Sequence, residues 1–230
     1  MADGPGLTKV PWLLAQTAED VLAVQVPVPE PELAAVLPPG VVPDAHAGTG
    51  WVTVLAMRMV DVRPRWLPPV PGVSSFAQVG VRAFARSSGS GEPGVAFLAL
   101  DVSHRLVARV GRVALGIPYA HAPVQVEGGA VRSERLTATW RATGPTTAEP
   151  FFAERDVLFS VRRGRTCRSQ VRHPVEPVMD AVVDGDAAPA VTTVGLTAVG
   201  PGHAQAIPRL PSHVWLPRRE GARPLGPGSR

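Results

Sequence analysis

The segment VGVRAFAR (79–86) decides the fold class, because it alternates small apolar residues with larger or charged ones. Successive side chains of a β-strand point to opposite faces of a sheet. One face of this segment carries only small apolar residues: Val79, Val81, Ala83 and Ala85. Arg82 lies on the opposite face, so it points either into the interior of a closed sheet or to solvent. The pattern predicts a strand that is buried on at least one face.

Similar strand patterns extend outward from this segment in both directions. WVTVLAMRMV (51–60) is an apolar run in which Arg58 is the only charge. Further strands are predicted at 21–28, 95–101, 131–141, 157–161, 167–173, 191–199 and 213–216. Short helices are predicted at 31–37, at 103–115 with Ser103 as the N-cap, and at 147–152. Many short strands with few helices indicate a mainly β (α+β) barrel or sandwich.

The charge balance argues against a nucleic-acid-binding protein. The net charge is +4 and the sequence pI is ≈ 10.4, but the chain has a single lysine, Lys9. Arginine stays charged far above neutral pH, so a small arginine excess raises the pI strongly. Residues 217–230 alone carry +3, which leaves +1 for the rest. We therefore expect a single domain over 1–216, a disordered basic tail over 217–230, and no nucleic-acid partner.

The sequence also argues against several other classes of protein. One cysteine, Cys167, cannot form a disulfide framework or a cysteine-based zinc site. No apolar run approaches the length of a membrane span, and the N-terminus lacks the pattern of a signal peptide. The chain carries no phosphate-loop, dinucleotide-binding, nucleophile-elbow or zinc-protease motif. The expectation is a soluble cytoplasmic protein without a cofactor, a metal ion or a membrane partner.

Two further features have a structural and a functional interpretation. Cys167 lies among arginines, which lower a thiol pKa, but a small apolar residue on a strand is the favoured interpretation. The arginine-rich segment 162–172 could bind phosphates, yet it lacks interleaved aromatic residues. A solvated strand face is the favoured interpretation for that segment.

A set of segments in a fixed order carries a family resemblance. They are LPPG (37–40), GWVTVLAMRMVDVRPRWLPPVPGVSSF (50–76), VRAF (81–84), GVAFLALDVS (94–103), ARVGRVALGIPYAHA (108–122), FFAERDVLF (151–159) and VRHPVEPV (171–178). Together they resemble the bacterial YqjF-like family, whose function is unknown, within the acetoacetate decarboxylase-like superfamily. The resemblance spans roughly residues 10 to 218. It implies a curved antiparallel sheet that closes into a barrel-like fold, with a small-molecule pocket in its interior.

The superfamily's chemistry rests on a lysine that forms a Schiff base with a keto acid, in a segment that reads roughly G-R-E-x-x-G-x-P-K. The matching segment here is GRVALGIPY (111–119), so Tyr119 takes the place of that lysine. A Schiff base needs a primary amine, which a phenol cannot supply. The pocket carboxylate of an early strand corresponds to the neutral Gln78. Both departures argue against decarboxylation through an imine.

The candidate site residues follow from this resemblance. Tyr119 could donate a hydrogen bond to an oxyanion or act as an acid, or could be a core aromatic. The residues expected to bind a small organic anion are Gln78, Arg82, Arg109, Arg135 and Glu154. Glu154 could instead pair with its neighbour Arg155, and Asp101 and His104 are expected to have structural roles at a strand-to-helix turn.

Three functions follow, in order of preference. The first is a lyase- or isomerase-like enzyme that acts on a small anionic keto- or carboxy-compound by acid–base chemistry. The second is a non-catalytic binding protein that has lost the superfamily's lysine. The third, weaker one is a nucleic-acid-associated protein that uses the basic tail. The resemblance also makes a homo-oligomer an expectation to be tested.

Overall fold

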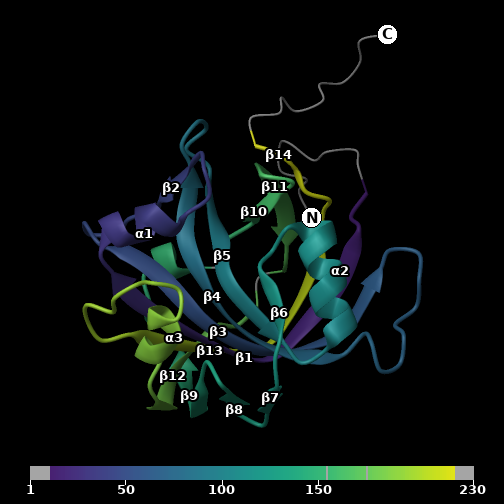
Figure 1. The fold of residues 1–230 in the computed structure, drawn as a ribbon. Coiled ribbons are helices and arrows are strands. Elements are labelled where there is room, and N and C mark those ends of the chain that lie inside the picture. The colour runs from purple at the N-terminus through teal and green to yellow at the C-terminus, as the bar shows by residue number, and fades with distance from the viewer. Residues whose placement is uncertain (1–10, 154, 175, 221–230) are drawn as a thin grey trace.

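The computed structural model describes residues 11–153, 155–174 and 176–220. Three α-helices cover a much larger set of strands (Figure 1). The helices are α1 (Glu30–Val36), α2 (Arg105–Leu115) and α3 (Ala188–Thr192). The strands are β1 (Leu14–Val28), β2 (Val41–Pro43), β3 (Gly50–Pro64), β4 (Phe76–Ser87), β5 (Pro93–Val102), β6 (Tyr119–His121), β7 (Val124–Glu127), β8 (Ala130–Ser133), β9 (Thr137–Pro145), β10 (Val157–Arg162), β11 (Arg165–Arg172), β12 (Met179–Gly185), β13 (His203–Val214) and β14 (Arg218–Arg219).

The strands form one large curved sheet, part of which closes on itself. Along the sheet the order is β14-β11-β10-β5-β4-β3-β1-β13-β12-β9-β8-β7. An additional pairing between β11 and β13 closes a ring of seven strands, from β11 through β10, β5, β4, β3 and β1 to β13. The fold class is therefore mainly β, as predicted. The sheet is mixed rather than purely antiparallel, because β5 pairs in parallel with both β10 and β6.

Irregularities in the long strands go together with this curvature. The register between β1 and β3 shifts between Glu19 and Leu22, where Asp20 has a φ of 50°. The register between β4 and β5 also shifts, between Val81 and Arg82. Such bulges bend a strand and increase its twist, which a sheet needs in order to close.

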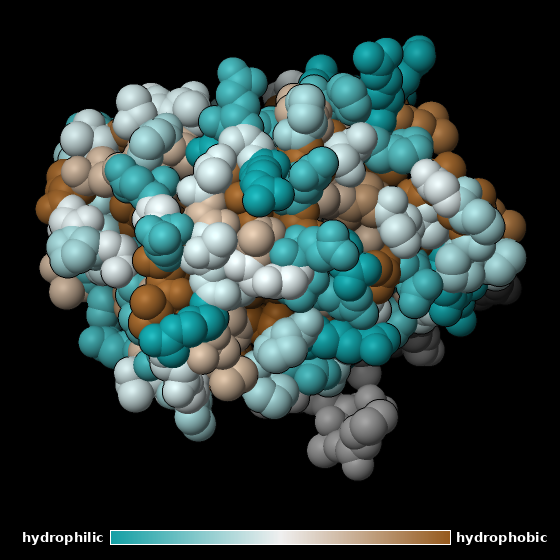
Figure 2. All heavy atoms as spheres, turned by 90° about the horizontal axis from the view of Figure 1, so that it is seen from below, coloured by the Kyte–Doolittle hydropathy of each residue, from teal (hydrophilic) through white to brown (hydrophobic). Residues whose placement is uncertain are grey.

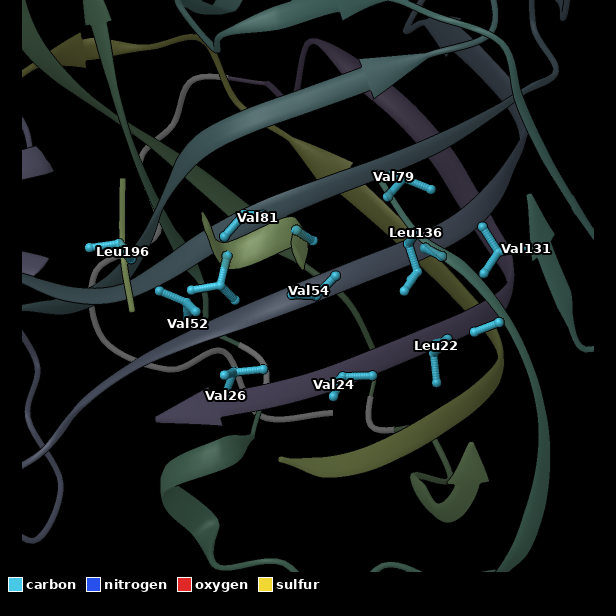
Figure 3. Close-up of a cluster of buried hydrophobic side chains, with 14 of the residues drawn as sticks. Leu22, Val24, Val26, Val52, Val54, Val79, Val81, Val131, Leu136 and Leu196 are labelled. Atoms are coloured by element: carbon cyan, nitrogen blue, oxygen red, sulfur yellow. The ribbon is translucent and has the colours of Figure 1, made fainter. Parts of the chain in front are cut away.

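The two faces of the ring strands build two separate cores. The outer core includes Val52 and Val54 of β3 and Val79 and Val81 of β4, all fully buried. Figure 3 shows these side chains together with those of β1 and with Leu196, which follows α3. The inner core takes residues from all seven ring strands, among them Leu55, Met57 and Met59. Because the small apolar face of β4 packs outward, Arg82 faces the interior of the ring.

Several expected elements differ in the structure. The segment predicted as strand 191–199 contains the end of α3 and a loop instead. The predicted strand 131–141 is interrupted by a turn between β8 and β9, and only a short 3₁₀ turn, Pro150–Phe152, forms where a helix over 147–152 was expected. Helix α2 is capped by His104, whose Nδ1 accepts a hydrogen bond from the Val107 amide, and not by Ser103.

Ser103 has another role, because its hydroxyl oxygen accepts a hydrogen bond from the Ala77 amide at 3.0 Å. Within the segment 217–230 expected to be a tail, Arg218 and Arg219 pair with β11 as β14, while residues 221–230 lie outside the described part of the chain. Figure 2 shows the lower face of the molecule, with small hydrophobic areas between hydrophilic residues. None of the described helices has the length and apolar character that a membrane crossing requires.

Candidate functional site

The ring encloses a cavity of ≈ 120 Å³. Most of its wall is apolar and comes from the inner core, including Leu55 and Met57 of β3 and Phe97 and Leu100 of β5. The polar or charged residues in the wall are Gln16, Gln78, Arg82, Tyr119, Arg155, His173 and Ser212. Among the described residues that line the cavity, none is acidic. The cavity therefore combines an apolar wall with two arginines and a few neutral hydrogen-bonding groups.

Three of the predicted site residues meet in this cavity. Gln78 and Arg82 both lie on the inner face of β4, and Tyr119 is the first residue of β6. The parallel pairing of Leu100 with Tyr119 brings β6 beside β5 and so places the tyrosine at the cavity wall. Residues that lie about 40 positions apart in the sequence thus share one wall.

Tyr119 is held by helix α2. A side chain at Gly111 would place its Cβ 2.6 Å from Cε2 of the Tyr119 ring, so the helix approaches the ring closely because residue 111 is glycine. Arg112 of the same helix donates hydrogen bonds to the Tyr119 carbonyl. The Tyr119 hydroxyl makes no hydrogen bond to another described residue. Burial raises its pKa to about 12, so the phenol is neutral and can act as a hydrogen-bond donor near pH 7.

Arg82 is 8% exposed and stands on the inner face of β4. Its neighbours in the ladder are Thr53 on one side and Phe97 on the other. A buried guanidinium costs free energy unless charges and hydrogen bonds compensate it. Arg82 lines the interior cavity and is therefore not the plain surface residue that the strand pattern also allowed.

Arg155 is a second cationic group of the wall, which the sequence did not single out as a site residue. Its guanidinium lies 3.2 Å from an Asp44 carboxylate oxygen, donates to the Phe151 carbonyl at 2.9 Å, and lies over the Phe84 and Phe151 rings. Arg155 therefore has Asp44 as its acidic partner. Glu154, the partner considered from the sequence, lies outside the described residues.

The other two predicted arginines lie elsewhere. Arg109 is exposed on α2. Arg135 forms a two-pronged ion pair with Asp101, at 2.9 Å and 3.1 Å, and also donates to Thr193 Oγ1. The carboxylate-binding capacity expected of Arg135 is thus used inside the protein, where it joins the turn before β9 to β5 and to the segment after α3. Asp101 has the structural role expected of it.

His173 completes the polar wall and was missed as a site residue. It follows β11, in the VRHP part of a segment already noted for its family resemblance. Its Nε2 is buried, makes no hydrogen bond to another described residue and lies 3.9 Å from a carboxylate oxygen of Asp156, while Nδ1 lies 3.3 Å from the Pro174 carbonyl. An imidazole at a cavity wall is a candidate for proton transfer to or from a ligand.

A larger hollow of ≈ 570 Å³ lies outside the ring, beside α3 and β12. Asp180 is its main charged group. The Asp180 carboxylate accepts hydrogen bonds from the Thr146 hydroxyl at 2.7 Å and from the Thr147 hydroxyl and amide at 2.8 and 3.0 Å. These bonds lower the pKa of Asp180. Because the carboxylate is already satisfied by its own protein, this hollow is a weaker candidate than the interior cavity.

A groove of ≈ 530 Å³ on the outside shares two residues with the interior cavity, Phe97 and Ile117. The cavity and the groove thus lie on either side of these two side chains. Among the described residues, no three histidine, cysteine or carboxylate side chains lie together as metal ligands would.

Several solved structures have a fold similar to that of this chain. The fold is similar to that of MppR, an enduracididine biosynthesis enzyme solved with the condensation product of pyruvate and imidazole 4-carboxaldehyde, with a TM-score of 0.68, 14% identity, and coverage of 91% of this chain and 90% of that one. It is also similar to acetoacetate decarboxylase from Legionella pneumophila, with a TM-score of 0.65, 14% identity, and coverage of 96% and 92%. An acetoacetate decarboxylase-like enzyme from Sphingomonas wittichii RW1 gives a TM-score of 0.62 at 12% identity, with coverage of 96% and 100%. The acetoacetate decarboxylase-like fold expected from the sequence is confirmed.

Sequence comparison gives the family. Uncharacterized protein YqjF of Bacillus subtilis (strain 168) is 31% identical over 154 residues, which cover 64% of this chain and 63% of that protein. The match thus spans less than two thirds of the relative's length. The model of the family DUF2071, described as an uncharacterized conserved protein, matches residues 15–211, which include all seven strands of the ring except the ends of β1 and β13. The YqjF resemblance is therefore confirmed, and the chain belongs to the DUF2071 family.

Proposed function

We propose that the interior cavity binds a small organic anion with a carboxylate and a keto or second carboxy group. One observation carries this proposal: the side chains of Arg82 and Arg155, the second of them paired with Asp44, line a mostly apolar cavity whose described wall residues include no acidic side chain. A guanidinium binds a carboxylate through two parallel hydrogen bonds. The solved neighbours support the proposal, because one structure of MppR contains pyruvate.

The size of the cavity limits the ligand. Small-ligand pockets usually have volumes of about 300–1,000 Å³, so a cavity of ≈ 120 Å³ is suited to a small ligand. A short-chain keto acid fits this limit better than a sugar or a nucleotide. A larger ligand would require movement of Phe97 and Ile117.

Within this site, the residues support acid–base chemistry without an imine. The only lysine, Lys9, lies outside the described residues, and no described residue of the cavity wall carries a primary amine. The neutral Tyr119 phenol is suited to donate a hydrogen bond to a carbonyl oxygen on which negative charge develops. Arg82 would hold the carboxylate.

The simplest reaction of this kind is enolisation. The C–H bond next to the carbonyl breaks, its proton goes to Nε2 of His173, and its electron pair moves to form the enolate. Tyr119 then hydrogen-bonds the enolate oxygen. Return of the proton from His173 to the opposite face of the same carbon completes an isomerisation. In a lyase reaction, the electron pair of the enolate instead expels a leaving group from the adjacent carbon, and the His173 proton passes to that leaving group. A lyase- or isomerase-like activity is thus the first candidate.

A non-catalytic binding protein is the second candidate, and a specific observation favours it. Tyr119 and Gln78 are neutral at the two positions where the superfamily uses a lysine and a carboxylate. Such a protein would keep the arginines and the cavity and would lack turnover.

Calorimetric titration with pyruvate and with methyl pyruvate tests the binding step. We expect pyruvate to bind and the uncharged ester to bind at least about tenfold more weakly, because a hydrogen bond to a charged group contributes about 1.5–3 kcal/mol. Arg82→Met should weaken pyruvate binding by a similar factor. Arg109→Met removes the same charge from the exposed face of α2 and should leave binding unchanged. Equal binding of acid and ester would refute the proposed role of the arginines.

Exchange of the pyruvate methyl protons in D₂O, followed by NMR, tests catalysis separately. The enzyme candidate predicts exchange above the buffer rate, and Tyr119→Phe should slow that exchange while pyruvate still binds. Binding without any accelerated exchange of pyruvate or of longer 2-keto acids would select the non-catalytic candidate.

A further inference from the structure

A basic groove lies at the tip of the β10–β11 hairpin and shares no lining residue with the interior cavity. Its volume is ≈ 470 Å³, and β14 contributes to its wall. Four of the six residues that line it are arginines, and none is acidic: Arg162, Arg163, Arg165, Cys167, Pro217 and Arg219. The groove is independent of the function proposed above.

The strand register explains why the arginines gather. Arg162 of β10 stands directly opposite Arg165 of β11, and Cys167 of β11 stands opposite Arg219 of β14. Arg165 and Cys167 are two residues apart on one strand, so their side chains share a face. Three neighbouring strands therefore place Arg162, Arg165 and Arg219 on one face, and the hairpin turn adds Arg163.

This arrangement does not serve folding. Like charges directly opposite each other in a ladder destabilise it. The four arginines form no ion pair with an acidic residue anywhere in the described chain. Two acidic residues on neighbouring segments have other partners: Glu92 pairs with Arg168 at 2.8 Å, and Oε1 of Glu220 accepts a hydrogen bond from the Ser87 hydroxyl. The Cγ of Arg162 lies close to Gly116, the residue that ends α2.

The turn itself adds a second cost. Arg163 has a φ of 50° and is followed by Gly164 with a φ of 70°, in a two-residue connection between β10 and β11. Such turns favour glycine, asparagine or aspartate at the first position, because other side chains are strained there. An arginine at this position brings a charge to the groove at the expense of backbone energy. Strain of this kind is typical of functional sites.

We infer that this groove binds a small oligophosphate, such as pyrophosphate or the phosphate chain of a nucleotide. Four guanidinium groups suit a ligand with several adjacent negative charges better than a ligand with a single carboxylate. Each guanidinium can bind a phosphate through two hydrogen bonds. The volume lies within the range of about 300–1,000 Å³ usual for small-ligand pockets. The lining contains no aromatic side chain on which the bases of a nucleic acid could stack, so the groove fits phosphates alone.

Titration calorimetry of the full chain with sodium pyrophosphate and sodium tripolyphosphate tests this inference. We expect binding that strengthens from pyrophosphate to tripolyphosphate and weakens as the salt concentration rises. The double variant Arg165→Gln/Arg219→Gln should lower the affinity at least about tenfold. Arg105→Gln/Arg109→Gln, which removes two exposed arginines of α2, is the matched control and should keep the affinity.

Arg163→Gly gives a readout that is not affected by misfolding. Glycine relieves the positive φ, so the variant should unfold at the same or a higher urea concentration while it binds tripolyphosphate more weakly. Equal loss of affinity in the α2 control would show a general charge effect and would overturn the site. Tighter binding of a single-stranded oligonucleotide than of tripolyphosphate, lost in the same double variant, would replace the small ligand by nucleic acid. Absence of tripolyphosphate binding in low salt would refute the inference, and pyruvate binding in the cavity is independent of all these outcomes.

Discussion

The chain contains a single tyrosine, so the environment of the cavity can be tested by titrating one group. Burial raises the pKa of Tyr119 to about 12, from an ordinary value of 10.0. At pH 11 about 10% of Tyr119 would be ionised in the native protein, against about 90% in the unfolded chain. A stopped-flow jump to alkaline pH, with tyrosinate absorbance read before the protein unfolds, should therefore give a native midpoint well above that measured in urea.

The same difference in the pKa of Tyr119 between the folded and the unfolded chain also makes the free energy of unfolding depend on pH. Because the pKa is higher in the folded state, the folded protein holds the phenolic proton between pH 10 and 12 while the unfolded chain releases it. The free energy of unfolding should therefore fall as the pH rises above 10. The loss due to Tyr119 is about 1.4 kcal/mol at pH 11 and approaches about 2.7 kcal/mol above pH 12, at 1.36 kcal/mol per pKa unit.

Tyr119→Phe is the control for both measurements. It removes the tyrosinate signal, and urea unfolding of this variant should lose less stability between pH 9 and pH 11 than the wild type. A native midpoint close to 10 would mean that the hydroxyl is in contact with bulk water. That result would refute the role of Tyr119 as a buried hydrogen-bond donor and, with it, the enolisation scheme.

Three further variants test the surroundings of the site, each by urea unfolding. Gly111→Ala should lower stability by about 1–2 kcal/mol, because a Cβ placed 2.6 Å from the phenol ring overpacks the contact by more than the gain in helix propensity of about 1 kcal/mol. Arg135→Met leaves the buried Asp101 carboxylate without its partner and should cost about 3 kcal/mol, whereas a change below 0.5 kcal/mol would make the pair a weak surface contact. The pKa of Asp180 is lowered in the folded state, so its ionised carboxylate stabilises the folded protein above the ordinary pKa of 3.8, and this stabilisation is lost as the pH falls below that value. Asp180→Asn should therefore make the free energy of unfolding less dependent on pH in this acidic range. A pH dependence equal to that of the wild type would contradict the hydrogen-bond network around Asp180.

Much of the ring could be predicted from side-chain periodicity. The alternation of residues 79–86 fixed which face of β4 is small and apolar, and the structure packs Val79 and Val81 in the outer core. The sequence allowed Arg82 to point either into the interior of a closed sheet or to solvent, because a strand pattern shows which residues share a face but not what covers that face. The ring closure between β11 and β13 decides between them, and it is a contact between distant segments.

The errors have physical causes of the same kind. The segment around Val191 is rich in valine and threonine, which favour strands, but Pro189 in the first turn and packing of Ala190 and Val191 on the outer core stabilise a short helix instead. Arg135 was expected to bind a small organic anion. Its partner Asp101 lies 34 residues away, and only the tertiary fold brings the two together.

The buried polar residues of the inner face fall into two groups, and this division carries the functional argument. Thr53 donates to Gln25 at 2.6 Å, Gln25 to Gln205 at 3.3 Å, and Gln205 to Thr146 at 3.0 Å. This line of residues satisfies its own hydrogen bonds, as a stable interior requires, and needs no ligand.

The cavity wall is different. The side chain of Gln78 and the hydroxyl of Tyr119 make no hydrogen bond to another described residue, although Gln78 is 7% exposed. Both groups can therefore form hydrogen bonds with water or with a ligand in the cavity. The same wall also contains Arg82 and Arg155, so a small anion in the cavity can bond to the neutral groups and lie beside two guanidinium groups at once.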